Sequence, residues 1–284
     1  MATGTADSAT GSRNRSLMGS LAERVSVRRL LVVYFVAIAL YVYAPMLSVI
    51  GFSFNEGGLS FPFVGFTLEP YSVLLSNDAM IQAVTRSLKL ALVVTVITTV
   101  LATATALAYR YEFRGQRAVL FLLILGIITP GITYGVGATL FLNEVLGLSK
   151  GLWLATTVHV VWTLPFAVIV LLAGFPPTLA ENEEAARVMG ASRWNTFREI
   201  ILPQIAPTVL GAAVFAFTLS YNEATRGLLL LGTENTMPIE VFSIASGVAI
   251  EQYLFALGSL TTIVSTVLLV IAGALVIYGG QVTS

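Results

Sequence analysis

The sequence predicts an all-α polytopic membrane protein with six transmembrane helices. Three observations favour this class: 56% of the 284 residues are hydrophobic, only 11% are charged, and long stretches of the chain contain no Asp, Glu, Lys or Arg. Soluble domains carry about 25% charged residues, so the apolar excess here requires surroundings other than water. A helix that crosses a bilayer needs about 20 apolar residues. Each charge-free stretch is long enough to be such a helix.

The six stretches are 30–55, 90–109, 118–143, 151–180, 200–222 and 252–284. Their apolar residues run continuously instead of alternating with polar ones, which indicates helices and not the strands of a barrel. The sequence therefore predicts a polar N-terminal tail, 1–29, and one transmembrane domain, 30–280. Pro130, Pro165 and Pro207 lie in or beside stretches, where proline disturbs a helix. The sequence alone does not distinguish two interpretations of these prolines: ordinary kinks, or a broken helix that lines a path.

The distribution of basic residues predicts the orientation. With the N-terminus in the cytoplasm, the inner segments carry eleven of the fifteen Lys and Arg residues and the outer segments carry four. Cytoplasmic loops are enriched in Lys and Arg, so both termini are expected in the cytoplasm. The outer segments hold more acids than bases.

The inner loop at about 176–204 is expected to fold as two short helices joined at a glycine. Thr178 and Glu181 have capping-box spacing, which predicts that the first helix begins at Leu179. Glu183 and Arg187 stand four residues apart in the order that favours an ion pair.

Gly190 is the expected stop of this first helix. Ser192 can cap a second helix over 193–201, and Pro203 is expected to end it. Helical spacing places three small or apolar residues on one face of the first helix, which another backbone could approach closely. These residues are Ala185, Ala186 and Met189. A plain amphipathic helix at the membrane surface is the alternative.

Parts of this loop resemble the EAA loop of binding-protein-dependent ABC importer permeases. The matching residues are Glu184-Ala185-Ala186, Gly190, and Ile200-Ile201-Leu202-Pro203. In that family the loop lies between the fourth and fifth of six spans, which is where the charge-free stretches place it here. The resemblance implies a type I ABC importer permease fold. It also implies that this loop couples to an ATPase, and the residues expected to do so are Glu184, Ala185, Ala186, Met189, Gly190, Ile200, Leu202 and Pro203.

The resemblance also implies the setting in which the chain works. Its expected partners are ABC ATPase subunits, a second permease subunit and an extracytoplasmic substrate-binding protein, and its expected location is the inner membrane. Stretches such as SFNEG at 53–57 and FTLSYNE at 217–223 are most similar to the spermidine/putrescine (PotC-like) branch. A polyamine is therefore the expected solute, and an anionic or zwitterionic solute such as a phosphonate is the alternative. Gly131 and Asn222 stand where that branch often has acidic residues.

Four residues are candidates for the substrate path. Tyr221, Asn222 and Glu223 form an abrupt polar triplet at the end of the fifth stretch, and Tyr134 lies in the third. Carboxylates and aromatic rings suit an ammonium group. An ordinary span end with a tyrosine at the membrane interface is the alternative for the triplet.

Composition excludes several other classes. The chain has no cysteine and only one histidine, His159, so no metal site built from Cys or several His is expected, and no cofactor. Neither lysine lies in a phosphate-binding loop, so the chain is not expected to be an enzyme that hydrolyses ATP. Equal numbers of acidic and basic residues argue against a nucleic-acid partner. A secondary transporter or channel that works without ATP is the alternative function, although such proteins usually carry charges or repeats within their spans.

Overall fold

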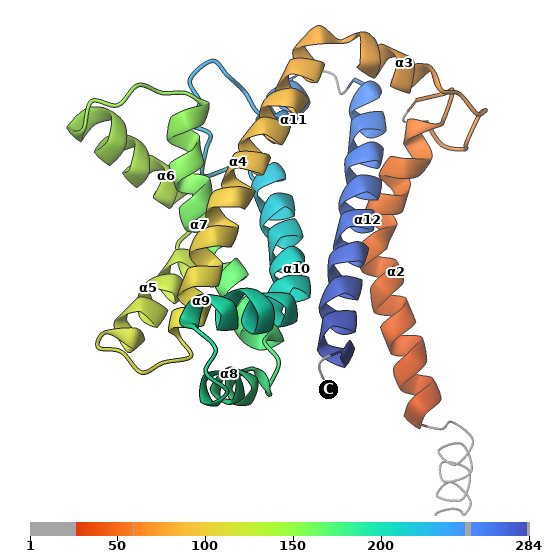
Figure 1. Ribbon diagram of the computed structural model, residues 1–284. Helices are drawn as coiled ribbons and strands as arrows, with labels where there is room; N and C mark the ends of the chain where they lie inside the picture. Colours follow the sequence, from red (N-terminus) through yellow and green to blue (C-terminus); the bar gives the residue numbers. More distant parts are fainter. Residues whose placement is uncertain (1–26, 59, 248–250, 283–284) are drawn as a thin grey trace, which may run out of the picture.

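The computed structural model describes residues 27–58, 60–247 and 251–282, and this part of the chain is helical, with one isolated β-bridge between Asn55 and Phe66 and no strand (Figure 1). Its elements in chain order are α2 (Val27–Ser53), α3 (Glu69–Ser76), α4 (Asp78–Ala108), α5 (Gln116–Ile128), α6 (Gly131–Thr139), the π-helix η1 (Leu140–Val145), α7 (Leu152–Gly174), α8 (Leu179–Val188), α9 (Arg193–Asn195), the π-helix η2 (Thr196–Ile201), α10 (Leu202–Tyr221), α11 (Met237–Ala245) and α12 (Tyr253–Val282). Positions 1–26 of the predicted tail lie outside the described residues, and α2 begins within the last three positions of that tail.

Among the described residues, five helices are long and apolar enough to cross a membrane: α2, α4, α7, α12 and the continuous run Arg193–Tyr221 that ends in α10. A sixth span results if α5 is joined to α6 and η1, which are bent against each other by 107°. The predicted all-helical class is therefore confirmed, with five or six candidate spans.

The third predicted stretch is a broken helix and not a kinked one. Thr129 has extended backbone angles, φ −63° and ψ 124°, between α5 and α6. The residue before a proline is disfavoured in the helical conformation, so Pro130 explains why the chain leaves the helix at this point. Pro165 and Pro207, in contrast, stay inside α7 and α10.

Pro203 does not end the second loop helix, which corrects the prediction. It lies at the start of α10, inside the continuous helical run Arg193–Tyr221, so the helix passes through it. The π-helix η2 directly precedes it, and its wider turn accommodates the ring that would strain an α-helical turn. The second loop helix and the fifth span therefore form one continuous helix, Arg193–Tyr221.

The core is formed where α4, α7 and α10 cross, and α12 connects this bundle to the outlying α2 (Figure 1). Alanines dominate the contact of the three central helices: Ala102, Ala106, Ala167 and Ala212 are buried there. Small side chains let membrane helices approach closely. This packing fixes the ends of α4 and α10, which carry the loop helix.

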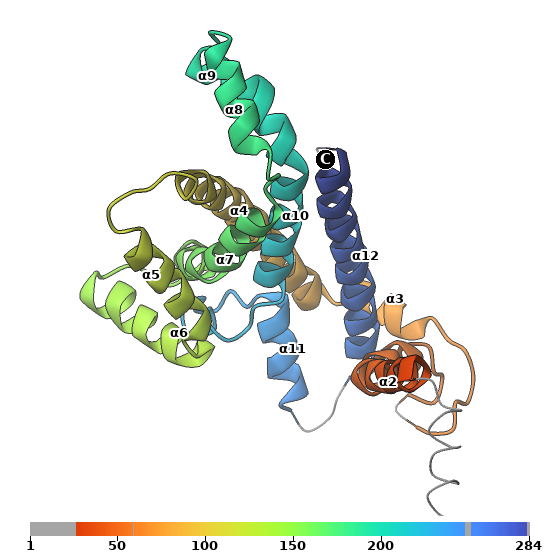
Figure 2. The same ribbon diagram turned by 90° about the horizontal axis from the view of Figure 1, so that it is seen from below.

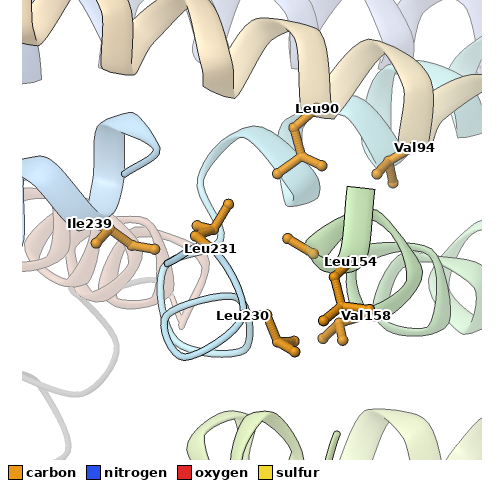
Figure 3. Packing of buried hydrophobic residues seen from close by; sticks show 8 residues of the cluster. Leu90, Val94, Leu154, Val158, Leu230, Leu231 and Ile239 are labelled. Atoms are coloured by element: carbon orange, nitrogen blue, oxygen red, sulfur yellow. The ribbon is translucent and has the colours of Figure 1, made fainter. Parts of the chain in front are cut away.

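The segment between α10 and α11 folds back into the bundle. Leu230 and Leu231 of this segment are fully buried among Leu154 and Val158 of α7 and Leu90 of α4 (Figure 3). A loop that only connected two spans at the surface would be exposed, so this one is part of the core.

The loop helix α8 lies at the same end of the molecule as the start of α2 and the end of α12 (Figure 1). Seen from below, α8 and α9 extend away from the bundle (Figure 2). Both ends of the described chain thus share one side with the loop helix, as the predicted orientation requires. Which side faces the cytoplasm stays a prediction.

Candidate functional site

The loop helix α8 begins and ends as the sequence predicts. It starts at Leu179, and Gly190 follows its end with φ +86°. The Gly190 N–H donates to the carbonyl of Arg187 at 3.0 Å, and the Ala191 N–H donates to that of Ala186 at 3.0 Å. This pair of bonds is the Schellman arrangement, which needs a left-handed residue at the position of Gly190. Ser192 caps the following turn by accepting from the Asn195 N–H at 3.2 Å, as predicted.

The predicted capping box is wrong. The Thr178 hydroxyl is buried without a hydrogen-bond partner among the described residues. The backbone angles of Thr178, φ −76° and ψ −5°, are already helical. A capping residue normally has extended angles, which direct its side chain at the first free N–H groups. The turn after Pro176 starts α8 instead, through a bond from the Leu179 N–H to the Pro176 carbonyl at 3.1 Å.

Glu183 anchors α8 to the end of α4. Its carboxylate accepts from the Arg110 guanidinium at 2.5 Å and from the Tyr111 hydroxyl at 2.7 Å. The predicted pair with Arg187 is wrong, because the carboxylate turns toward the bundle and only the charge of Arg187 lies nearby. Burial opposes the ionisation of Glu183, but the bonds from Tyr111 and Arg110 outweigh it and hold the pKa of Glu183 below its usual value.

The exposed face of α8 differs from the predicted one. Ala186 is buried against the chain with 3% exposure, whereas Glu184 and Ala185 are exposed. Val188 and Met189 are 83% and 80% exposed. The residues further along the loop vary: Ile200 is half-buried, and Leu202 and Pro203 are exposed. We call Glu184, Ala185, Val188 and Met189, four exposed residues at and just after the end of α8, the α8 outer face.

The four candidate path residues do not all lie together. Tyr134 of α6 packs on the core cluster around Leu154, whereas Tyr221 packs on a separate cluster around Leu254. The Tyr221 ring stacks on Phe217 with centroids 5.8 Å apart. Asn222 is exposed and donates to the carbonyl of Thr218.

Glu223 is buried, and it is paired. Its Oε2 accepts from Nη1 of Arg226 at 2.7 Å, and the two side chains are 7% and 11% exposed. The Arg226 guanidinium lies 3.4 Å from the centroid of the Trp162 ring, in the middle of α7. The charge distribution along the sequence placed Arg226 in an outer loop and did not reveal this pair. The i,i+3 spacing of the two charges between apolar residues was the signal available.

His159 lies one turn before Trp162 and is also fully buried. Its Nδ1 and the Ser220 hydroxyl are 2.9 Å apart, while its Nε2 has no partner among the described residues. The contact with Ser220 joins α7 to α10 in the core. No group of acids and histidines suited to a metal ion occurs in the described part of the chain.

The Glu183 anchor should hold α8 over a broad pH range. Glu183 has a depressed pKa in the fold, so its contribution is complete above the ordinary value of 4.5 and is lost as the pH falls through the lower, folded value. The bond to Glu183 raises the pKa of Tyr111, so that contribution is complete below the ordinary value of 10.0 and is lost as the pH rises through the raised one. The rate of tryptic cleavage at Arg187 and Arg193, divided at each pH by the rate for an unstructured peptide substrate, should therefore be constant from about pH 6.5 to about pH 9. A transition near neutral pH would contradict this assignment.

Comparison with known proteins gives a consistent result. The family model described as "Binding-protein-dependent transport system inner membrane component" matches residues 79–279. The spermidine/putrescine transport system permease protein PotC of Escherichia coli K12 is 32% identical over 84% of this chain and 90% of its own length. The putrescine transport system permease protein PotI of the same organism is 29% identical over 72% of this chain and 75% of its own length.

Solved structures share the fold. A chain from a bacterial ABC transporter involved in the import of the acidic polysaccharide alginate matches with a TM-score of 0.64, covers 95% of this chain and all of its own, and is 17% identical. A chain from an amino acid ABC transporter matches with a TM-score of 0.51 over 76% of this chain and 99% of its own at 16% identity. At such identities the likeness concerns the fold alone.

Proposed function

This chain belongs to the family of binding-protein-dependent transport system inner membrane components, and we propose that it is the permease subunit of an ATP-driven importer whose ATPase binds the α8 outer face. The observation that carries this proposal is the exposure of two large apolar side chains, Val188 and Met189, at the end of a helix that an ion pair and a Schellman turn hold rigidly. Apolar side chains in such a position favour burial in a partner.

The proposed assembly follows from the family. It contains ABC ATPase subunits on the side of α8, which is then the cytoplasmic side, a second permease subunit and an extracytoplasmic substrate-binding protein. This chain supplies the membrane path and coupling, and the ATPase subunits supply the hydrolysis. Co-purification of an ATPase subunit with the detergent-solubilised chain would separate this function from that of a secondary transporter or channel that works alone.

We propose a polyamine or a similar organic cation as the solute. The support is the identity to PotC and PotI over most of the chain. A phosphonate or another anionic or zwitterionic solute is the second candidate, because Arg226 neutralises Glu223 in the core. The test is to identify the partner binding protein and to titrate it with spermidine, putrescine and an alkylphosphonate. Binding of the anion with no binding of either polyamine would overturn the polyamine assignment.

Ala185→Arg should weaken ATPase binding by about tenfold or more, because a long charged side chain would stand on a closely packed interface. The measurement is the amount of ATPase recovered with the tagged permease. Ala118→Arg is the matched control, since Ala118 is exposed in the first turn of α5, away from α8. Equal recovery with both variants would argue against docking at α8. Ala186→Arg is unsuitable, because Ala186 is buried inside the chain.

Gly190→Val should uncouple ATP hydrolysis from transport while the protein still inserts. At φ +86° an L-residue costs about 1–2 kcal/mol, and a β-branched one costs more, so the turn would open and change the angle between α8 and α9. A Cβ at this position would meet no other atom, so the effect is one of conformation and not of crowding. Gly147→Val is the control, because Gly147 has φ +67° and equally open surroundings in a loop remote in sequence from α8. Wild-type uptake per ATP in Gly190→Val would refute the role of the turn.

A further inference from the structure

The side chain of Arg226 lies in surroundings that suit a bound organic cation. Nη1 contacts the Glu223 carboxylate at 2.7 Å, and the guanidinium carbon lies 3.4 Å from the centroid of Trp162. A carboxylate and the face of an indole are the two groups that most favour an ammonium or guanidinium ion in proteins. Both stand side by side in the interior of a chain that crosses a membrane.

The two groups are held in place without the help of the guanidinium. Oε1 of Glu223 accepts from the Thr225 N–H and hydroxyl, each at 2.8 Å, and from the Arg226 backbone N–H at 3.0 Å. The Trp162 ring packs edge-on against Phe166, with centroids 4.7 Å apart. The carboxylate and the ring would therefore keep their positions if the arginine side chain moved away.

The space beside the guanidinium is bordered by the backbone of the broken span. A Cβ on Gly131 would stand 3.1 Å from Nη1 of Arg226, and one on Gly135 would stand 2.8 Å from the Arg226 carbonyl. Both glycines belong to α6, which follows the 107° break. Tyr134, which lies near enough to Arg226 to experience its charge, lines a hollow of about 440 Å³ between α6 and α7.

We propose that Glu223 and Trp162 form a binding site for a cationic group of the transported solute, and that Arg226 occupies this site as a tethered competitor in the present conformation. The proposal rests on the proposed function for its solute, an organic cation. The incoming cation replaces the guanidinium at Glu223 and Trp162, and Arg226 returns when the cation leaves. A positive charge therefore pairs with the buried Glu223 carboxylate in both states.

The test measures cation binding directly, without ATPase or uptake. The full-length chain is placed in nanodiscs with Trp153 and Trp194, both largely exposed, replaced by phenylalanine, so that Trp162 alone reports by fluorescence. The probes are guanidinium and spermidine. Arg226→Ala should bind both with an affinity at least about tenfold higher than the parent chain, because removing a competitor that fills the site most of the time raises the competent fraction by that factor. Either cation at millimolar concentration should also raise the thermal stability of this variant.

Arg226→Gln, which keeps the first three carbons of the side chain and removes the charge, should behave as Arg226→Ala does. Glu223→Gln added to Arg226→Ala should abolish the binding, and Arg86→Ala, an arginine that contacts Asn235 outside the site, should leave the parent's affinity unchanged. Unchanged affinity in both Arg226 variants would overturn the proposal, as would their failure to fold even with added guanidinium. Binding of an alkylphosphonate that requires Arg226 would overturn it in favour of an anion site. If the importer assignment is wrong, the co-purification experiment shows this separately, because no ATPase subunit is recovered with the chain.

Discussion

Glu223→Ala should cost the folded chain about 3–5 kcal/mol, a larger loss than we expect from any substitution in α8. Removing the carboxylate leaves the Arg226 guanidinium, 11% exposed, with no opposite charge in the core. The aromatic face of Trp162 cannot replace the lost charge pairing. The measurement is the thermal unfolding of the detergent-solubilised protein, together with the yield of monodisperse protein.

A double variant tests whether the loss comes from the unpaired charge. Glu223→Gln combined with Arg226→Gln removes both charges, so it should recover much of the stability that Glu223→Ala loses. Glu234→Ala is the matched control, because Glu234 accepts a long bond of 3.3 Å at an exposed position. If Glu223→Ala melted like the control, the ion pair would contribute nothing to the fold.

Glu183→Ala should release α8 from the bundle and reduce the recovery of the ATPase subunit. The Glu183 and Arg110 side chains are 11% and 14% exposed, so the cost of separating them lies between that of surface and buried pairs, about 2 kcal/mol. Both Arg110 and Tyr111 lose their acceptor. The consequences to measure are faster tryptic cleavage after Arg187 and a lower amount of co-purified ATPase.

Glu181→Ala is the control for this change, because Glu181 is an exposed carboxylate in the first turn of the same helix. It should leave both cleavage and ATPase recovery close to those of the parent protein. Slow cleavage in Glu183→Ala would mean that the apolar contact of Leu179, at the start of α8, with Ile201 and Ile205 holds the helix without the ion pair.

The loop helix could be predicted because its signals are local. Gly190 ends α8 through a backbone conformation that favours glycine, and Ser192 caps through bonds within its own turn. The spans could be located for a similar reason, since length and apolar composition decide them. Local signals failed where the wider structure decided the outcome. Glu183 pairs with Arg110 of the segment after α4 and not with Arg187, and the π-helix before Pro203 accommodates its ring.

The interior of the bundle was the hardest part to predict. The stretch after Glu223 contains a charge and few apolar residues before Leu228, so it resembles a surface loop. Only the packing of Leu230 and Leu231 against α4 and α7 shows that it folds inward (Figure 3). The contact of Arg226 with Trp162, 64 residues away in the chain, leaves no trace in local spacing. The break at Pro130 was one of two open alternatives, because a proline alone does not distinguish a kink from a break.

The most direct test of the proposed function is ATP-dependent uptake by proteoliposomes. They would contain this chain, the ATPase that co-purifies with it and the second permease subunit, with the binding protein added outside. We expect accumulation of radiolabelled spermidine or putrescine only when ATP is enclosed and the binding protein is present, and its loss in Ala185→Arg. Uptake by this chain alone, driven by an ion gradient without ATP or the ATPase, would contradict the central claim.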